Sequence, residues 1–377
     1  HGCTAAELRK ALRAVAGAQG AGGGMGLSLC TERQHSEDSE DRSCGALLSR
    51  ACMADPWRGS RVLVTGATGL LGRQVFKAFR RRGWVLRGLA LSRASGDLLR
   101  CDLTEPKEVA HQFAAFRPHI VIHCAAERRP DRLEANRAYA RRINEEVARD
   151  IAMSCSRYGS WLVYLSTNYV FDGRATPYAE DATPQPLSVY GESKLAGERA
   201  VAATHADAAI VRVPLLYGPI ERVGETSVDG LLTSVRAERS PRLCNWQERY
   251  PTNTEDVAAV LEAMARAYVG RRGSLLDGDA GNEKNPALED LRGVFHWQAN
   301  ERHTKYSMAV IIAEIANVDA SNFVQVDTAP PVGSAPRPQY ERMLCTRLEK
   351  LLGISADKSC YRSNFKEGMK RYLAPFV

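Results

Sequence analysis

Short apolar runs alternate with amphipathic stretches between residues 61 and 213. The runs are rich in valine, isoleucine and leucine, which is typical of parallel strands that are buried on both faces. The apolar runs, which we interpret as strands, are 62–64, 84–90, 98–103, 119–123, 161–165 and 208–213. The predicted helices between them are 70–82, 105–116, 138–158 and 189–203. This alternation predicts an α/β fold: a doubly wound parallel sheet, the NAD(P)-binding Rossmann fold.

The alternation loosens after Pro214, where prolines and glycines become frequent. The predicted elements of this half are a helix at 254–268, a polar surface loop at 270–292, a strand at 293–297 and a helix at 304–316. Thr254 and Thr304 precede apolar helical patterns, so we expect each of them to cap its helix.

These patterns predict a dinucleotide-binding domain at 58–213. Residues 214–377 are predicted to form a smaller α/β lobe, interleaved with that domain and lying over the carboxyl ends of its strands. Residues 1–57 are rich in alanine, glycine and polar residues, so we expect a disordered or non-native leader. Met53, just before the first strand, is a natural start for a compact domain.

Composition limits the class of protein. Hydrophobic residues make up 44% of the 377 residues, enough for a core, and no apolar run approaches the ~18 residues of a membrane span. The net charge of +7 comes from scattered arginines without an interleaved aromatic platform, so solvated helix faces that also suit anionic ligands are favoured over nucleic-acid binding. The ten cysteines form no C-x-x-C pair, which indicates free thiols and no metal site. We expect a cytoplasmic protein, which is also compatible with a nuclear pool.

A glycine-rich loop joins the first predicted strand to the first predicted helix. Gly66 permits a sharp exit from the strand, Gly69 a close approach to a diphosphate, and Gly72 close packing of the helix on the sheet. The free N–H groups and the dipole at the start of the helix favour an anion. The spacing therefore predicts a dinucleotide site, and a purely structural tight turn is the alternative.

Tyr190 and Lys194 are four residues apart on a predicted helix, so they share one face. A neighbouring ammonium lowers the pKa of a phenol, which then donates a proton to a carbonyl that accepts hydride from a reduced nicotinamide. Thr167, at the end of the preceding strand, is placed to hydrogen-bond the same carbonyl. Asn144, inside a predicted helix, is placed to hold Lys194 through water. A surface Tyr–Lys pair and a strand-end cap at Thr167 are the alternatives.

Three segments carry a family resemblance: Gly66-x-x-Gly69-x-x-Gly72, Ser166-Thr167-Asn168-Tyr169-Val170-Phe171-Asp172-Gly173, and Tyr190-Gly191-Glu192-Ser193-Lys194. Together they resemble the extended short-chain dehydrogenase/reductase superfamily and its dTDP-4-dehydrorhamnose reductase branch. Residues 121–131 and 295–297, with 304–306 shortly after, are most similar to the family of regulatory beta subunits of methionine adenosyltransferase. The resemblance covers about residues 60–375, apart from the predicted loop at 270–292.

The resemblance implies NADP(H) as the cofactor. The implied contacts are Thr68, Gly69, Leu70 and Leu71 at the phosphates, Leu91, Ser92 and Arg93 at the adenosine ribose, and Asp102 and Leu103 at the adenine. Cys124 and Arg128 would lie beside the middle of the cofactor, and Tyr190 and Lys194 at its nicotinamide end. Leu216 would form a wall of the same pocket. No acid follows the second strand to bind a 2′-hydroxyl, and Arg93 suits a 2′-phosphate. The alternatives are a solvated loop charge at Arg93, a small core residue at Cys124, and surface charges at Arg128 and Arg129.

The resemblance also implies the function. A regulatory subunit would bind a catalytic methionine adenosyltransferase subunit and support S-adenosylmethionine synthesis, with Thr167, Tyr190 and Lys194 as a vestigial site. It also implies a basic C-terminal tail that docks into the catalytic dimer, which the sequence up to Val377 does not contain. An NADPH-dependent reductase of a 4-keto sugar nucleotide is the alternative, and a redox-sensing binding module is a weaker one. Two departures weaken the reductase hypothesis: Asn168 replaces the usual aspartate, so a local charge is missing, and residues 127–130 differ from the substrate-side loop.

Overall fold

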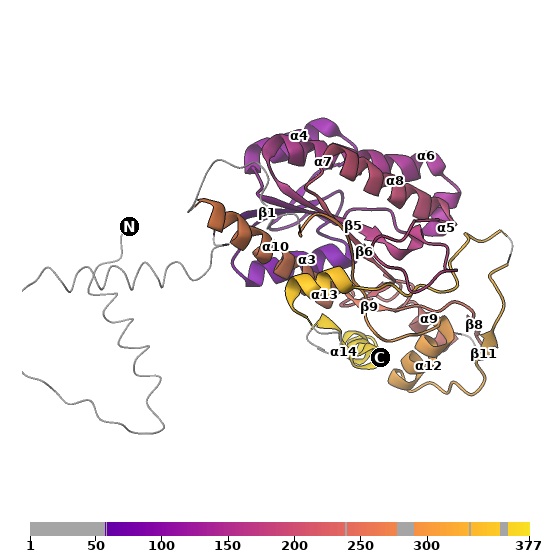
Figure 1. Ribbon diagram of the computed structural model, residues 1–377. Helices are drawn as coiled ribbons and strands as arrows, with labels where there is room; N and C mark the ends of the chain where they lie inside the picture. Colours follow the sequence, from indigo (N-terminus) through magenta and orange to yellow (C-terminus); the bar gives the residue numbers. More distant parts are fainter. Residues whose placement is uncertain (1–56, 58, 238–239, 277–289, 332, 355–360) are drawn as a thin grey trace, which may run out of the picture. The chain divides into compact units, whose positions relative to one another are not determined.

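A parallel sheet forms the centre of the described chain (Figure 1). Its seven strands lie in the order β10-β6-β5-β4-β1-β2-β3. The strands are β1 (Arg61–Thr65), β2 (Val85–Ala90), β3 (Leu98–Arg100), β4 (Ile120–His123), β5 (Trp161–Thr167), β6 (Ala209–Val213) and β10 (Gly293–His296). The direction of winding reverses between β1 and β4, and doubly wound folds bind their ligands at the carboxyl ends of the strands beside such a switch point. The predicted fold class is confirmed.

The computed structural model describes residues 57, 59–237, 240–276, 290–331, 333–354 and 361–377. The predicted leader, except for Trp57, and residues 277–289 of the predicted loop lie outside the described residues. Residues 55–377 form one compact unit, so the predicted boundary at 213 stays a prediction. Among the described helices, none has the length and hydrophobicity needed to cross a bilayer.

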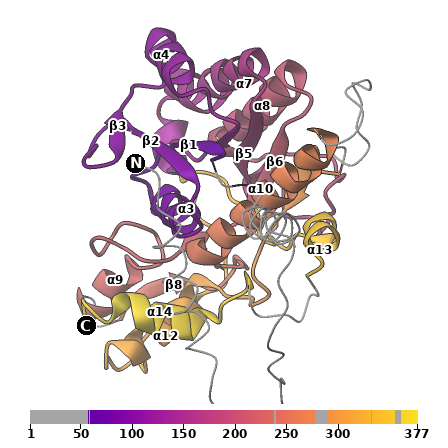
Figure 2. The same cartoon turned by 90° about the vertical axis from the view of Figure 1, so that its left-hand side faces the viewer.

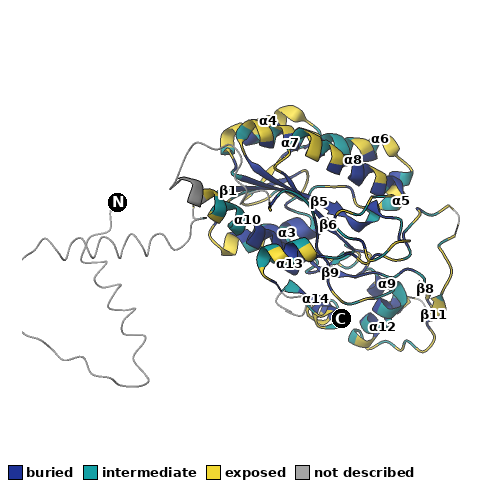
Figure 3. Ribbon diagram, in the orientation of Figure 1, coloured by how far each residue is buried: buried dark blue, intermediate teal, exposed yellow. Residues whose placement is uncertain are grey.

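Helices cover both faces of the sheet (Figures 1 and 2). One face carries α4 (Pro106–Phe116), α7 (Val147–Tyr158) and α8 (Val189–Thr204), and the other carries α3 (Leu70–Arg81) and α10 (Thr254–Leu276). Colouring by burial shows buried strands between helices whose outer sides are exposed (Figure 3).

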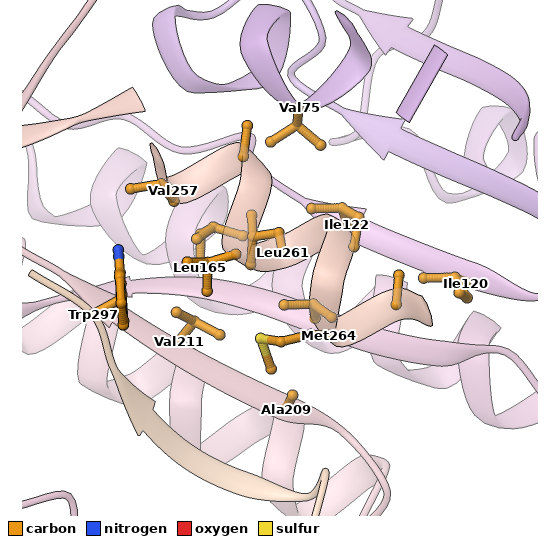
Figure 4. Close-up of a cluster of buried hydrophobic side chains, with 14 of the residues drawn as sticks. Val75, Ile120, Ile122, Leu165, Ala209, Val211, Val257, Leu261, Met264 and Trp297 are labelled. Atoms are coloured by element: carbon orange, nitrogen blue, oxygen red, sulfur yellow. The ribbon is translucent and has the colours of Figure 1, made fainter. Parts of the chain in front are cut away.

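The strands are apolar throughout because alternate residues enter different cores. In β1, Val62 and Val64 join the core beneath α3 and α10, whereas Leu63 joins the core beneath α4 and α7. Figure 4 shows the first of these cores, where Leu261 and Met264 of α10 lie among side chains of the central strands. Because successive side chains of a strand point to opposite faces, each strand contributes alternate residues to each core.

The second half of the chain completes the sheet and adds a third core. Its β10 pairs with β6 at one edge, and its α10 packs along α3. The third core joins α9 (Leu231–Ala237), α12 (Lys305–Ile315) and α14 (Phe365–Leu373). The remaining elements of this half are β7 (Leu216–Tyr217), β8 (Arg242–Cys244), β9 (Thr252–Asn253), β11 (Val324–Val326) and α13 (Thr346–Leu352).

The predicted helix at 138–158 is not one regular helix. After the unpredicted α5 (Pro130–Glu134), the chain forms α6 (Arg137–Arg141), a π-helical turn (Arg142–Glu146) and then α7. A π turn holds one more residue per hydrogen-bonded ring than an α turn, and such turns occur often at functional sites. A helical period in the sequence does not reveal this insertion.

Two predictions for α10 were wrong. The helix continues to Leu276 and does not stop at residue 268, because Val269 to Arg272 include no proline and the single Gly270 is tolerated. Its cap is Asn253, whose side-chain oxygen accepts the N–H of Glu255 at 3.0 Å. The hydroxyl of Thr254 is buried without a hydrogen-bond partner among the described residues. At α12 the prediction is confirmed, because Thr304 caps the helix in a capping box with Ser307.

A buried ion pair joins α8 to β6. The Arg212 guanidinium donates to both carboxylate oxygens of Glu198, at 2.9 and 2.6 Å, and both side chains are at most 5% exposed. We predict that Glu198→Gln lowers the free energy of unfolding by about 3–5 kcal/mol, because it leaves a buried charge without its counter-charge. Urea denaturation measures this change.

Glu192→Gln on the same helix is the matched control. Glu192 pairs with Arg137 on the surface, where both side chains are at least 50% exposed, so its loss costs less than about 1 kcal/mol. Equal costs for the two variants would contradict the role given to the buried pair.

Candidate functional site

The glycine loop after β1 is packed too tightly for side chains. Gly66 has φ +64°, and a Cβ on it would lie 2.8 Å from the backbone of Ala125. A Cβ on Gly72, in the first turn of α3, would lie 2.1 Å from the carbonyl oxygen of Gly66. The predicted sharp exit at Gly66 is therefore present, and Gly72 packs against the loop itself.

Helix α3 begins at Leu70 with Gly69 as its N-cap, and no side chain caps it. The first N–H groups of a helix have no intrahelical partners, and the helix dipole adds positive potential there. Thr68, Leu70 and Leu71 thus lie where an anion is favoured. The start of α3 therefore offers N–H groups without a side-chain cap, and the contact of each residue with a cofactor stays a prediction.

Two arginines hold the loop from outside. Arg93 donates to the carbonyl oxygen of Thr68 at 2.7 Å and to the carboxylate of Glu221 at 2.6 Å. Arg73 donates to the same carbonyl at 3.0 Å. The Arg93 side chain is 55% exposed, so its ion pair with Glu221 is open to exchange with another anion.

A segment of the second half, residues 219–229, lies against these arginines. Glu225 accepts two hydrogen bonds from Arg73, at 2.7 and 3.0 Å, and its backbone carbonyl accepts one from Arg128. Asp229 fixes the segment by accepting the N–H groups of Gly224, Glu225 and Thr226. The sequence analysis missed Arg73 and both glutamates: the position of Arg73 directly after Gly72 is a usable signal, but nothing local marks a segment some 150 residues away.

The predicted adenosine contacts lie at the carboxyl ends of β2 and β3. Leu91, Ser92 and Arg93 follow β2 and are exposed, and this turn contains no carboxylate. Asp102 follows β3 and accepts the N–H and hydroxyl of Thr104, so part of its role is to order the start of α4. Leu103 is buried in the core beside α4. The turn itself offers a cation and no acid, but Glu221 from the second half of the chain pairs with that cation, so the preference for a 2′-phosphate stays a prediction.

Cys124 and Leu216 lie farther along the same edge. Cys124 follows β4, and burial raises the pKa of its thiol to about 12 although the positive Lys194 opposes the shift. Leu216 is half-buried in β7 and packs on the core beneath α3. The Cys124 thiol is neutral at physiological pH, which agrees with the alternative of a small core residue and leaves its cofactor contact a prediction.

Tyr190, Lys194 and Thr167 come together as predicted, Tyr190 and Lys194 on α8 and Thr167 at the end of β5. A hydrogen bond joins Thr167 to the Tyr190 hydroxyl. The buried Lys194 ammonium donates to the carbonyl oxygen of Leu165 at 2.7 Å and lies 4.0 Å from the centre of the Tyr164 ring. Lys194 is thus held by a backbone oxygen and an aromatic face, and not by the Tyr190 hydroxyl.

The predicted effect of Lys194 on Tyr190 was wrong. Burial raises the pKa of the Tyr190 phenol to about 12, and the hydrogen bond with Thr167 opposes this only in part. Burial also lowers the pKa of Lys194 to about 7, against the attraction of Glu198. Desolvation disfavours the charged form of both groups. It therefore raises the pKa of the phenol and lowers the pKa of the ammonium, and both shifts favour the neutral species.

Asn144 is buried in the π-helical turn, but it does not contact Lys194. Its amide exchanges two hydrogen bonds with the backbone of Glu127, both 3.2 Å long, and donates to Ser193 at 3.0 Å. Its backbone carbonyl accepts the hydroxyl of Tyr164, the residue under the Lys194 ammonium. Asn144 therefore links the loop after β4 to α8, and its expected contact with Lys194 through water stays a prediction.

The loop after β4 is organised around Glu127. This buried carboxylate accepts hydrogen bonds from Arg129 at 2.8 and 2.9 Å and from Arg132 at 3.0 Å. Burial alone would raise its pKa, but the bonds from Arg129 hold it below the usual value. Arg129 is therefore more than a surface charge, because it neutralises the buried acid of this loop.

The acid that position 168 lacks is supplied from elsewhere in the chain. The Asn168 amide donates to the buried carboxylate of Glu341 at 2.7 Å, and the side chain of Gln247 donates to the other oxygen. Burial raises the pKa of Glu341 to about 7. An acid is thus present beside position 168, although it comes from a residue 173 positions away.

The described cysteines are free: Cys101, Cys124, Cys155, Cys244 and Cys345. The other five lie outside the described residues. In the part of the chain that the structure describes, no group of three or more His, Cys, Asp or Glu side chains is arranged to hold a metal ion.

Comparisons with known proteins assign the family. A family model described as the RmlD substrate binding domain matches residues 60–375. Methionine adenosyltransferase 2 subunit beta of Danio rerio is 40% identical over 324 residues, which cover 85% of this chain and 92% of that protein. The protein of the same name from Bos taurus is 38% identical over 318 residues, covering 84% and 88%.

A solved structure agrees with the fold. The crystal structure of dTDP-4-dehydrorhamnose reductase from Bacillus anthracis in complex with NADP is 26% identical, with a TM-score of 0.66 over 84% of this chain and 98% of that chain. The chain therefore belongs to the RmlD substrate binding domain family and, within it, to the methionine adenosyltransferase 2 subunit beta family. The resemblance found in the sequence is confirmed.

The low pKa of Lys194 predicts a pH effect on stability. Below about pH 7 the folded and unfolded chains both carry the lysine proton, so the full free-energy cost of burying the charge opposes folding. Between about 7 and the ordinary value of 10.5 only the unfolded chain keeps it, so the contribution of Lys194 to the free energy of unfolding rises with pH.

We predict that wild type gains stability relative to Lys194→Met as the pH rises from 7 to 9, measured by urea denaturation of both proteins. The difference between their free energies of unfolding does not contain the contribution of any group that titrates in the same way in both proteins. A difference that stays constant with pH would contradict a buried lysine with a lowered pKa.

Proposed function

We propose that this protein is an NADP(H)-binding regulatory subunit of methionine adenosyltransferase that supports S-adenosylmethionine synthesis. The observation that carries the proposal is 40% identity over 92% of a protein named as the beta subunit of that enzyme. The proposed partner is the catalytic methionine adenosyltransferase subunit. The Thr167–Tyr190–Lys194 site is then retained from an oxidoreductase architecture and serves mainly to bind the cofactor.

The glycine loop supports the cofactor part of the proposal. Gly66 and Gly72 let the loop pack closely on neighbouring backbone, because Cβ atoms on either residue would collide with it. The N–H groups at Leu70 and Leu71 would hold the phosphates, and Arg93 would exchange Glu221 for a 2′-phosphate. Tyr190 and Lys194 would bind the nicotinamide end, with Asp102, Cys124, Arg128 and Leu216 along the path between.

The bound cofactor has a structural role in this proposal. A ligand that binds only the folded chain adds RT ln(1 + [L]/Kd) to stability. The loop, α3 and residues 219–229 all meet at the proposed phosphate site, so the ligand would hold the two halves of the chain together. The cofactor itself would supply hydride chemistry, for which Tyr190, protonated at neutral pH, would donate a hydrogen bond or a proton.

A reductase acting on a 4-keto sugar nucleotide is the second candidate. The observation that favours it is the convergence of Thr167 and Tyr190, joined by a hydrogen bond, with Lys194 on the same helix. Here Tyr190 is the acid, Thr167 orients the carbonyl, and Lys194 tunes the site. The loop built around Glu127 counts against it, whereas the replacement of an aspartate by Asn168 counts less, because Glu341 places an acid beside that position.

Cofactor preference tests the role of Arg93. We predict that NADP⁺ raises the melting temperature more than NAD⁺ does. Arg93→Ala should reduce the difference between these two shifts, because it weakens NADP⁺ binding about tenfold or more. Glu221→Gln should increase the difference between the two melting-temperature shifts, because it frees Arg93 from its ion pair. Calorimetric titration gives the affinities.

Arg80→Ala is the matched control for the Arg93 variant. Arg80 is 67% exposed on α3 and pairs with Asp97, so its loss should leave the difference between the two cofactors unchanged. Equal stabilisation of wild type by the two cofactors would refute the role of Arg93.

Association separates the two candidate functions. We predict that the full chain co-purifies with a catalytic methionine adenosyltransferase subunit and that Tyr190→Phe leaves this association intact, because the hydroxyl serves the pocket and not the partner. No association at micromolar concentrations would count against the regulatory role. If the protein is a reductase, NADPH absorbance falls on adding dTDP-4-dehydrorhamnose, and Tyr190→Phe abolishes the fall.

A further inference from the structure

A cleft of about 620 Å³ runs between α3 and α10, which lie side by side on one face of the sheet (Figure 2). Each helix contributes a stripe of side chains that are three or four residues apart. The α3 stripe is Gln74, Ala78 and Arg81, and the α10 stripe is Glu255, Ala259, Glu262 and Arg266. At 1.5 Å of rise per residue these stripes are about 10 and 16 Å long, so the cleft is elongated.

The cleft holds more positive charge than its own acids neutralise. Both of its acids are already paired with arginines of the cleft. Glu262 accepts hydrogen bonds from Arg266 at 2.9 and 3.1 Å, and Glu255 accepts one from Arg371 at 2.7 Å. Three further cations line the cleft: Lys77, Arg81 and Arg82. Five cationic and two acidic side chains therefore leave three positive charges uncompensated.

Lys77, Arg81 and Arg82 are exposed and have no counter-charge. No hydrogen bond or ion pair within the described residues involves their side chains, whereas the adjacent Arg80 pairs with Asp97. Lys77 and Arg81 are four residues apart on α3, so these two like charges are neighbours on the helix surface and repel each other. The helix dipole favours cations in the last turn of α3, but it does not explain Lys77 one turn earlier. An anion between these side chains would relieve the repulsion.

An acidic peptide segment fits the cleft better than other anions do. An extended chain advances about 3.3 Å per residue, so roughly three to five residues would span the stripes, whereas a single phosphate would meet only part of the charge. Among the described residues that line the cleft, only Ala78, Ala259 and Tyr361 are apolar or aromatic. The cleft therefore offers neither the apolar groove that a partner helix needs nor a row of rings on which bases stack.

We propose that the cleft between α3 and α10 binds a segment rich in aspartate and glutamate from a partner protein. The carboxylates of that segment lie against Lys77, Arg81 and Arg82, and the small side chains of Ala78 and Ala259 leave room for its backbone. The interaction goes beyond the proposed function, because neither the glycine loop nor the Tyr190–Lys194 pair lines the cleft.

Calorimetric titration of the full chain with octaglutamate, capped at both ends, tests the site. NADP⁺ is present at saturation, so that the peptide does not compete for the glycine loop. We expect saturable binding of one peptide per chain, with an affinity that falls as salt is added, because salt screens exposed charges. The triple variant Lys77→Met, Arg81→Gln and Arg82→Gln should weaken binding about tenfold or more, because it removes three charge pairs. Absence of saturable binding to the wild type would overturn the proposal.

A second triple variant is the matched control. Lys107→Met, Arg157→Gln and Arg199→Gln remove the same number of exposed charges from α4, α7 and α8, on the other face of the sheet. This variant should bind octaglutamate as the wild type does. An equal loss of affinity in the two triple variants would show that net charge and not the cleft binds the peptide, and would overturn the proposal.

Two further measurements make the test specific. Ala259→Glu places a carboxylate inside the cleft and should also weaken peptide binding, and cooperative urea unfolding shows that each variant folds. A single-stranded DNA of eight nucleotides is the second probe. If DNA binds more tightly than octaglutamate and loses its affinity in the cleft variants, the cleft is a nucleic-acid site and the peptide proposal is wrong.

Discussion

The contact between the first turn of α3 and the loop that precedes it constrains the rest of the structure. With hydrogen in place of a side chain at Gly72, the helix can lie directly on the carbonyl of Gly66. This contact brings the N-terminus of α3 to the switch point of the sheet, where backbone N–H groups and the helix dipole favour an anion. It also directs Arg73 toward residues 219–229, and the other side of the helix packs on α10. One close approach thus sets both the binding loop and the contact between the halves of the chain.

The Tyr190 site follows a different principle, because its polar groups are almost completely enclosed. Burial moves the pKa of the phenol up and that of the Lys194 ammonium down, so the site favours neutral groups when no other charge is present. Each enclosed group is then held by a specific partner: Lys194 by Leu165, and Asn144 by the loop after β4.

The second half of the chain does more than cover the sheet. It contributes strand β10, helix α10, the acidic residues that bind Arg73 and Arg93, and the Glu341 carboxylate beside Asn168. A protein that uses an oxidoreductase architecture for regulation needs its ligand to affect the whole fold. Here the proposed phosphate site joins both halves, so a ligand bound there would stabilise contacts between distant parts of the sequence.

The sequence by itself determined the parallel sheet, the glycine loop, the grouping of Tyr190 with Lys194 and the cap at Thr304. These features depend on short-range spacing: apolar runs, the strand period of two, the helix period of three to four and local capping chemistry. The family resemblance also followed from contiguous motifs. The tertiary structure alone decided the π turn at Asn144, the ion pair of Arg93 with Glu221, the carboxylate beside Asn168 and the direction of both pKa shifts at Tyr190 and Lys194. Those depend on burial and on partners far apart in the chain, and a pattern of neighbouring residues carries no information about which distant group fills a desolvated space.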